Sequence, residues 1–214
     1  MTAPPVPAVA GLLLAAGGGR RLGGRPKALL PYGDGLLVDH AVRVLHAGGC
    51  SPVLVVLGAG AQEVRARLAP SPGAAIRCID NPDWARGMGT SLRAGLAALA
   101  ATDAGAALVT LVDQPYVGPA AVARVLAAHR AGAGLVAAAY DGGRGHPVLF
   151  GREHWPGVAA AAEGDRGARV YLHRHAAAVR LVECGDVAAP DDVDTPADLA
   201  LLDRPGGRNG PAHH

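Results

Sequence analysis

The chain of 214 residues has few aromatic side chains and almost no net charge. Aromatic residues make up 3% of it and the formal net charge is +2, with the basic residues scattered singly or in pairs. Proteins that bind single-stranded nucleic acid need a basic surface interleaved with aromatic rings. We therefore expect no nucleic-acid partner.

Cysteine is also scarce. Cys50, Cys78 and Cys184 are far apart and form no C-x-x-C pair, which argues against a disulfide framework and against a cysteine zinc site. The histidines form neither an H-E-x-x-H motif nor an H-x-x-x-H helical pair. This cysteine usage is typical of a reducing cytoplasm.

No apolar run is long enough for a membrane span. The run Val6–Ala16 falls well below the roughly 20 residues needed, and no Lys or Arg precedes it as in a signal peptide. We expect a cytoplasmic protein without a membrane segment. Half of the residues are apolar, so residues 1–203 are predicted to form a single domain around one core. Residues 204–214 lack apolar periodicity and are predicted to be a flexible tail.

Short apolar segments alternate with segments of helical periodicity. The predicted strands cover residues 8–16, 52–58, 74–80, 106–113, 134–140 and 178–184, and the predicted helices cover residues 36–48, 60–69, 89–101 and 118–132. This alternation predicts an α/β fold with a doubly wound, mostly parallel, Rossmann-like sheet. Too few residues separate Tyr140 from the apolar segment 147–150 for a crossover helix, so a hairpin and one antiparallel strand are expected in the C-terminal half.

A glycine-rich loop follows the first predicted strand, where dinucleotide-binding proteins carry G-x-G-x-x-G. With Gly17 and Gly19 as the first two glycines, Leu22 occupies the third position, and residues 58–60 at the end of the second strand supply no acid for a ribose. A Walker loop is also excluded, since Lys27 follows a proline and precedes an alanine.

The same loop carries Arg20, Arg21 and Lys27 among its glycines. Free backbone N–H groups together with three cations suit a highly charged anion such as a nucleoside triphosphate. The alternative is a mobile surface loop with solvated basic residues.

Carboxylates appear at two further points. Asp113 ends an apolar strand, where a hard oxygen ligand suits Mg²⁺ on substrate phosphates; the alternative is a helix cap. In "DDVDTPADL" the Thr195 hydroxyl is predicted to cap a helix that begins at a proline and includes Asp198. Asp194 is not needed for that cap, and the two acids before Val193 are expected to be solvated charges.

The loop "LLAAGGGRRLGGRPKALLP" resembles that of the nucleotidyltransferases, most closely the molybdenum cofactor cytidylyltransferases. The motifs "NPDWARGMGTSLRAGL", "LVDQPYV", "RGHPVLF", "GDRGAR" and "DVDTPADL" follow in the order of that family, so the resemblance extends from Val9 to about Leu202. It implies a fold of the nucleotide-diphospho-sugar transferase type. It also implies magnesium-dependent transfer of CMP from CTP to the phosphate of molybdopterin, with release of pyrophosphate. A recipient molybdoenzyme or its chaperone is the implied protein partner.

The resemblance assigns roles residue by residue. The implied catalytic residues are Lys27, Arg21 and Asp113, with Asp113 and Asp194 as metal ligands. The implied nucleotide-binding residues are Leu14, Ala15, Ala16, Gly17, Gly18, Gly19, Arg20 and Ser91. The implied acceptor-binding residues are Arg144, His146 and Arg169. We expect Lys27 to lie in a solvent-accessible loop.

Several alternatives stay open. Ser91 could be a helix cap instead of a nucleoside contact. One extra residue between Gly23 and Pro26 leaves open whether Arg20 or Arg21 makes the main phosphate contact. Relatives that transfer guanylyl groups tend to carry glycine at the position of Ala16, so its methyl group favours CTP. A guanylyltransferase, a cytidylyltransferase for another small phosphate and a non-catalytic cofactor-binding chaperone are the competing hypotheses.

Overall fold

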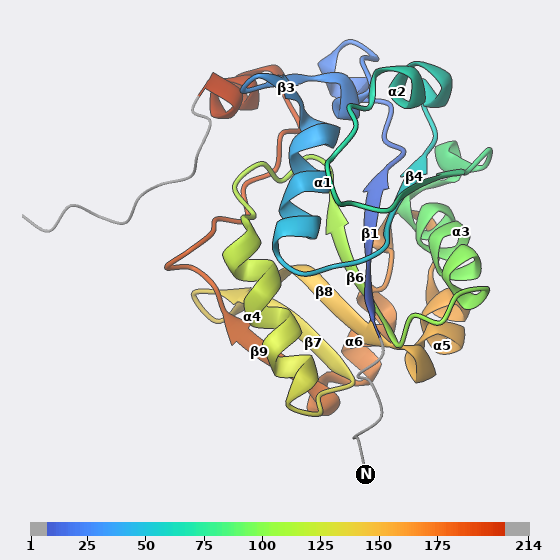
Figure 1. The fold of residues 1–214 in the computed structure, drawn as a ribbon, viewed down its shortest axis with the longest axis vertical. Helices are drawn as coiled ribbons and strands as arrows, with labels where there is room; N and C mark the ends of the chain where they lie inside the picture. Colours follow the sequence, from blue (N-terminus) through green and yellow to red (C-terminus); the bar gives the residue numbers. More distant parts are fainter. Residues whose placement is uncertain (1–7, 204–214) are drawn as a thin grey trace, which may run out of the picture.

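The computed structural model describes residues 8–203, and the tail predicted for residues 204–214 lies outside them. Its centre is a seven-stranded sheet in the order β5-β4-β1-β6-β8-β7-β9 (Figure 1). The strands are β1 (Val9–Ala15), β4 (Val53–Leu57), β5 (Ile76–Asp80), β6 (Ala106–Leu111), β7 (Leu135–Tyr140), β8 (Gly143–Gly151) and β9 (Val179–Glu183). A separate two-stranded sheet pairs β2 (Pro31–Tyr32) with β3 (Gly35–Leu36).

The sheet is parallel except for one strand. β1 pairs in parallel with β4 and β6, and β9 pairs in parallel with β7, whereas β8 runs antiparallel to both of its neighbours. The turn from β7 to β8 consists of Asp141 and Gly142, with φ of 51° and 77°. Two residues with positive φ form the tight hairpin turn that Asp-Gly favours. The predicted α/β fold with one antiparallel strand is confirmed.

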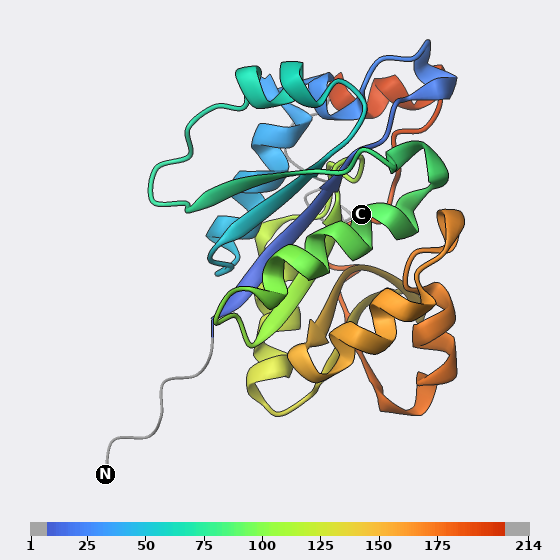
Figure 2. The ribbon, with the colours of Figure 1, turned by 90° about the vertical axis from the view of Figure 1, so that its right-hand side faces the viewer.

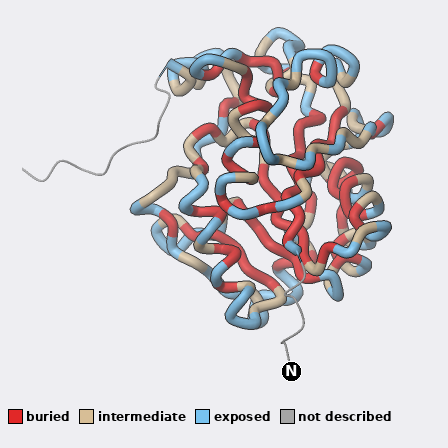
Figure 3. The backbone as a smooth tube through the Cα atoms, viewed as in Figure 1, coloured by how far each residue is buried: buried red, intermediate tan, exposed pale blue. Residues whose placement is uncertain are grey.

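Helices cover both faces of the sheet (Figure 2). They are α1 (Leu37–Ala47), α2 (Ala61–Arg67), α3 (Met88–Ala100), α4 (Pro119–Arg130), α5 (Trp155–Ala161) and α6 (Arg169–Arg174). One apolar cluster joins the sheet to α1, α2 and α4, and a second joins it to α3, α5 and α6. Leu12 and Leu13 of β1 point into different clusters, and both are fully buried. A strand buried on both faces explains the continuous apolar runs of the sequence (Figure 3).

The structure differs from the predictions at several ends of elements. α3 begins at Met88, and the segment after Thr195 is a 3₁₀ helix (Pro196–Asp203) instead of an α-helix. Within residues 8–203 no backbone N–H donates to the Thr195 hydroxyl, so it does not cap that helix. The hydroxyl instead donates to Asp198 Oδ2 at 2.9 Å, and the same oxygen accepts the Thr195 N–H at 2.7 Å. α5, α6 and the β2–β3 pair were not predicted; each is short, so its periodicity is weak.

Within residues 8–203 no helix has both the length and the apolar character that crossing a membrane requires.

Candidate active site

The glycine-rich loop after β1 forms a closed turn. Gly24 donates its N–H to the Gly19 carbonyl at 3.0 Å, and Gly19 has a φ of 57°. A Cβ atom on Gly19 would lie only 2.0 Å from the Arg25 carbonyl oxygen. Glycine is therefore required at position 19, both by the left-handed backbone and by the close approach of the returning chain.

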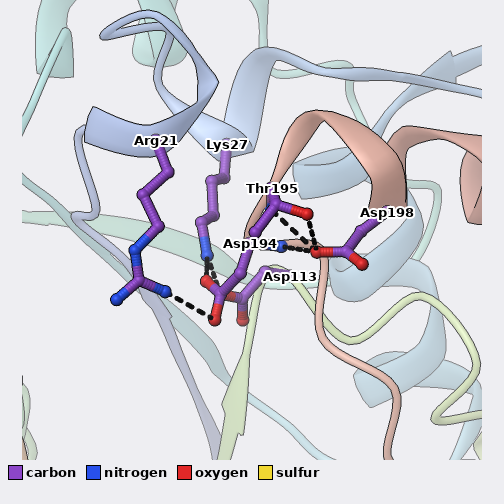
Figure 4. A network of polar contacts seen from close by, with 6 residues as sticks. All are labelled: Arg21, Lys27, Asp113, Asp194, Thr195 and Asp198. Carbon is purple, nitrogen blue, oxygen red and sulfur yellow. Dashed lines mark hydrogen bonds and ion pairs between the residues drawn. The ribbon is translucent and has the colours of Figure 1, made fainter.

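Lys27 lies at the centre of the site. Its Nζ is 2.6 Å from Asp113 Oδ2 and also donates to Asp194 Oδ1 (Figure 4). The Lys27 side chain is only 12% exposed, so the expectation that it lies in a solvent-accessible loop was wrong. Burial alone would lower its pKa, but the attraction of Asp113 and Asp194 outweighs burial and raises the pKa of Lys27 above its ordinary value. The ammonium group is thus charged throughout the neutral range.

A backbone hydrogen bond brings together the two carboxylates, which are far apart in the sequence. The N–H of Val193, a fully buried residue, donates to the Asp113 carbonyl at 2.9 Å, which sets Asp194 beside the end of β6. The Asp194 N–H in turn donates to Asp198 Oδ2 at 3.1 Å. α4 begins behind Gly118 without any side-chain cap, so Asp113 does not serve as its cap.

The pair Asp113 and Asp194 fits a magnesium ion by its chemistry. Both carboxylates reach one ammonium group, so their oxygens converge on a single point, and hard oxygens are the ligands that Mg²⁺ prefers. Residues 8–203 hold no cluster of three or more His, Cys, Asp or Glu side chains suited to a metal. The remaining ligands of such an ion would be phosphate oxygens and water, as is usual for Mg²⁺.

A first cleft of about 320 Å³ opens beside Lys27 at the carboxyl ends of the strands. Of the sequence-predicted residues, those lining it are Leu14, Ala16, Gly17, Gly18, Arg20, Lys27, Ser91 and Asp113. Four residues predicted for catalysis, nucleotide binding or metal binding do not line it, and one of them is Asp194, whose side chain is 46% exposed. Ala15 is buried in β1, Gly19 forms the turn, and Arg21 is 75% exposed with its guanidinium 3.9 Å from Asp194 Oδ2. Arg20 is thus the loop arginine that faces the cleft.

The Ser91 hydroxyl accepts a hydrogen bond from the buried side-chain amide of Asn81. Asn81 Nδ2 donates to the hydroxyl oxygens of Thr90, at 2.8 Å, and of Ser91, at 3.0 Å. Ser91 is 3% exposed and lies within the first turn of α3, whose N-cap is Gly87. The alternative that Ser91 caps this helix is therefore wrong.

A second cleft of about 380 Å³ adjoins the first and contains the three predicted acceptor residues, Arg144, His146 and Arg169. The two clefts share Leu14, Met88, Leu111 and Asp165 as wall residues. The floor of the second cleft is apolar, formed by Leu92, Val109, Val148, Phe150 and Leu172. Burial lowers the pKa of His146 to about 4, and the nearby arginines add to this effect, so its imidazole is neutral at pH 7.

Sequence reasoning missed two parts of the site. Asp192, expected to be a solvated charge, lines the second cleft. Partial burial and the nearby Asp113 carboxylate raise the pKa of Asp192. Trp84 lines the first cleft, and the signal that could have identified it is its place in "NPDWARG", directly after the end of a parallel strand.

The chain is similar to known proteins over most of its length. Residues 11–179 match the family model described as MobA-like NTP transferase domain. The chain is 44% identical over 197 residues to nicotine blue oxidoreductase of Paenarthrobacter nicotinovorans, covering 89% of this chain and 94% of that protein. It is 29% identical over 207 residues to molybdenum cofactor guanylyltransferase of Mesorhizobium japonicum, covering 92% and 95% of the two chains.

Solved structures share the fold. The crystal structure of Rv0371c from Mycobacterium tuberculosis H37Rv matches with a TM-score of 0.78 at 34% identity, covering 95% of this chain and 100% of that one. The structure of the same protein in complex with manganese matches with a TM-score of 0.72 at 31% identity, covering 92% and 99%. The relatives span this chain almost from end to end.

Proposed function

The chain belongs to the family of MobA-like NTP transferase domains, and on that basis we propose that it transfers CMP from CTP to the phosphate of molybdopterin. The observation that carries this proposal is the contact of Lys27 with both Asp113 and Asp194 beside the first of two adjoining clefts. One cleft would hold the nucleoside triphosphate and the other the acceptor. Residues 1–203 act as a single nucleotidyltransferase domain in this proposal, in the cytoplasm, and a recipient molybdoenzyme or its chaperone takes the product.

In the proposed reaction an oxygen of the acceptor phosphate attacks the α-phosphorus of CTP. A P–O bond to that phosphorus forms, the bond between the α- and β-phosphates breaks, and the electron pair leaves with pyrophosphate. The acceptor is itself the nucleophile, so the protein needs no Ser-His-Asp set and contributes positioning and charge. Lys27 and Arg20 would neutralise the phosphates, with Arg21 as a more exposed second cation. A Mg²⁺ or Mn²⁺ ion held by Asp113 and Asp194 would supply charge stabilisation when bound.

CTP is proposed over GTP because of Ala16. This residue is 5% exposed, it lines the first cleft at the end of β1, and its carbonyl accepts the Ala59 N–H at 3.1 Å. Its methyl group takes space that a purine would need. Discrimination by one methyl group is limited to roughly 10- to 200-fold, so GTP should be a poor substrate and need not be inert.

Molybdopterin is proposed as the acceptor because the second cleft combines two chemistries. Its apolar floor suits a flat heterocycle, and Arg144 and Arg169 at its rim suit a phosphate. A sugar phosphate would instead require polar groups along the floor to pair its hydroxyls.

The name of the relative at 44% identity, nicotine blue oxidoreductase, raises a second candidate, an oxidoreductase. Such a reaction needs a reductant site, but residue 22 is leucine where a dinucleotide fingerprint has glycine, and residues 58–60 offer no acid for a ribose. Nucleotidyl transfer uses Lys27 and both carboxylates, so it is the function we favour. A pure cofactor chaperone would not need the carboxylate pair.

The decisive experiment measures pyrophosphate release by the purified chain with Mg²⁺, molybdopterin and either CTP or GTP at matched low concentration. The expected result is acceptor-dependent release that is faster with CTP. Faster release with GTP would place the chain in the guanylyl branch. If no triphosphate supports release while NADH or NADPH is consumed in the presence of a flat dye, the oxidoreductase hypothesis holds instead.

A further inference from the structure

Trp84 lies on the far side of the first cleft from the carboxylates. It follows β5, whereas Asp113 follows β6, and the strand order places β4 and β1 between them. Three strand intervals of about 4.8 Å separate these two strand ends by roughly 14 Å. A triphosphate at Lys27 and Asp113 would therefore leave its nucleoside on the Trp84 side.

The Trp84 ring is fixed by two glycines on neighbouring segments. A Cβ atom on Gly18 would lie 3.0 Å from ring atoms Cη2 and Cζ3, and one on Gly58 would lie 2.5 Å from the Trp84 Cβ. The indole thus spans from the glycine-rich loop to the turn after β4. Gly58, which follows β4 where a ribose-binding acid would stand, instead leaves room for the Trp84 side chain.

Ala16 lies close to the same part of Trp84. A Cβ atom added to Gly58, which would contact Trp84, would also lie 2.8 Å from the Ala16 Cβ. The backbone of Trp84 is fixed as well, since its N–H donates at 3.3 Å to the carbonyl of Asn81, whose side chain holds Thr90 and Ser91. Trp84 and the Ala16 methyl group therefore lie side by side in the wall of the first cleft.

We propose that the Trp84 indole is the surface against which the nucleobase packs, and that Trp84 and Ala16 together select the base by size. This inference rests on the proposed nucleotidyl transfer and names the residue that reads its nucleoside. Packing of an aromatic ring against a base changes affinity by roughly 5- to 150-fold. Removing the ring therefore weakens binding of CTP and relaxes discrimination against the larger GTP.

The experiment uses the Trp155→Phe protein as parent, because Trp84 is then the sole tryptophan of the chain. Trp155 lines neither cleft, so the change leaves the wall of the nucleotide site intact. Because Trp155 is 4% exposed and donates its ring N–H to the Phe150 carbonyl at 3.0 Å, a thermal melt first checks that the parent folds. CTP and GTP are titrated with Mg²⁺ and without acceptor, and tryptophan fluorescence and calorimetry are recorded together. CTP is expected to change the fluorescence of Trp84.

Three variants in this parent complete the test. Trp84→Leu should lower the affinity for CTP at least about 5-fold and bring the affinities for CTP and GTP closer together. Trp84→Phe should retain most of the affinity for CTP and most of the discrimination against GTP. Gly58→Ala keeps the Trp84 ring but displaces it, and should lower the affinity for CTP as Trp84→Leu does. Thermal melts identify any variant that does not fold.

Two outcomes would overturn the proposal, and they can be told apart. If the parent binds CTP but a folded Trp84→Leu protein binds CTP and GTP with unchanged affinities, Trp84 does not read the base. If the parent binds no nucleoside triphosphate by calorimetry, the proposed nucleotidyl transfer fails and the role of Trp84 fails with it.

Discussion

The ion pairs of Lys27 permit a prediction that joins stability to metal binding. Lys27→Met keeps the length of the side chain but removes the only positive charge within 3 Å of the Asp113 carboxylate among residues 8–203. Asp113 is 18% exposed and Asp194 is 46% exposed. The variant therefore leaves one largely buried and one half-exposed carboxylate facing each other, with only the exposed Arg21 guanidinium, 3.9 Å from Asp194 Oδ2, as a counter-ion.

Removing one partner of a fully buried ion pair costs about 3–5 kcal/mol, and an exposed pair contributes about 0–1 kcal/mol. Since this pair lies between the two cases, Lys27→Met should lower the free energy of unfolding by about 1–3 kcal/mol. The pKa of Lys27 is raised in the folded protein, so its stabilising effect is complete below the ordinary value of 10.5 and disappears as the pH rises through the folded value. The difference in free energy of unfolding between wild type and variant should thus be constant from pH 6 to 9 and disappear only in strong alkali.

The assay is denaturant unfolding at pH 7.5 with and without 10 mM Mg²⁺, with Lys27→Arg as the charge-preserving control. Mg²⁺ should stabilise Lys27→Met more than wild type, because the ion replaces the missing charge between the two carboxylates. Turnover of the folded variant should fall by about 10²-fold or more through loss of transition-state charge stabilisation. Equal stability of wild type and Lys27→Met in the absence of metal would refute the reasoning, as would equal stabilisation of both by Mg²⁺.

Three further outcomes are expected. Asp194→Asn should abolish Mg²⁺-dependent pyrophosphate release while Asp192→Asn retains most of it, and strong activity of Asp194→Asn would show that the metal ligand has been misplaced. Gly19→Ala should disrupt the glycine-rich loop, since its methyl group would lie 2.0 Å from the Arg25 carbonyl oxygen; an unchanged KM for the nucleotide would contradict this. The pKa of His146 falls to about 4 on folding, so the unfolded chain takes up a proton near pH 6.5 that the folded chain refuses. The free energy of unfolding should therefore decline below about pH 6.5 by at most ~1.4 kcal/mol per pH unit. Measured by denaturant unfolding in EDTA, so that no metal is bound, the decline should be shallower for His146→Gln than for wild type.

The sequence alone was sufficient for the alternating strands and helices and for the antiparallel β8. Each of these depends on local features, namely apolar runs, helical periodicity and the few residues between Tyr140 and the apolar segment 147–150. Prediction from the sequence failed, or misplaced the ends of an element, where a segment is short or rich in alanine. The Pro196–Asp203 segment forms a 3₁₀ helix, and the Asp198 carboxylate accepts hydrogen bonds from the backbone N–H groups of Asp194 and Thr195 at its start, contacts that periodicity does not report.

The sequence by itself determined which chemical groups the protein has: a glycine-rich loop with basic residues, carboxylates after β6 and near the C-terminus, and arginines beside β8. Only the tertiary structure decided which of these groups meet. The hydrogen bond from Val193 to Asp113 brings two acids 81 positions apart onto Lys27, and the strand order places Trp84 beside Gly18 and Gly58. Such contacts depend on the packing of strands distant in the chain, whereas the motifs of a sequence reflect only near neighbours.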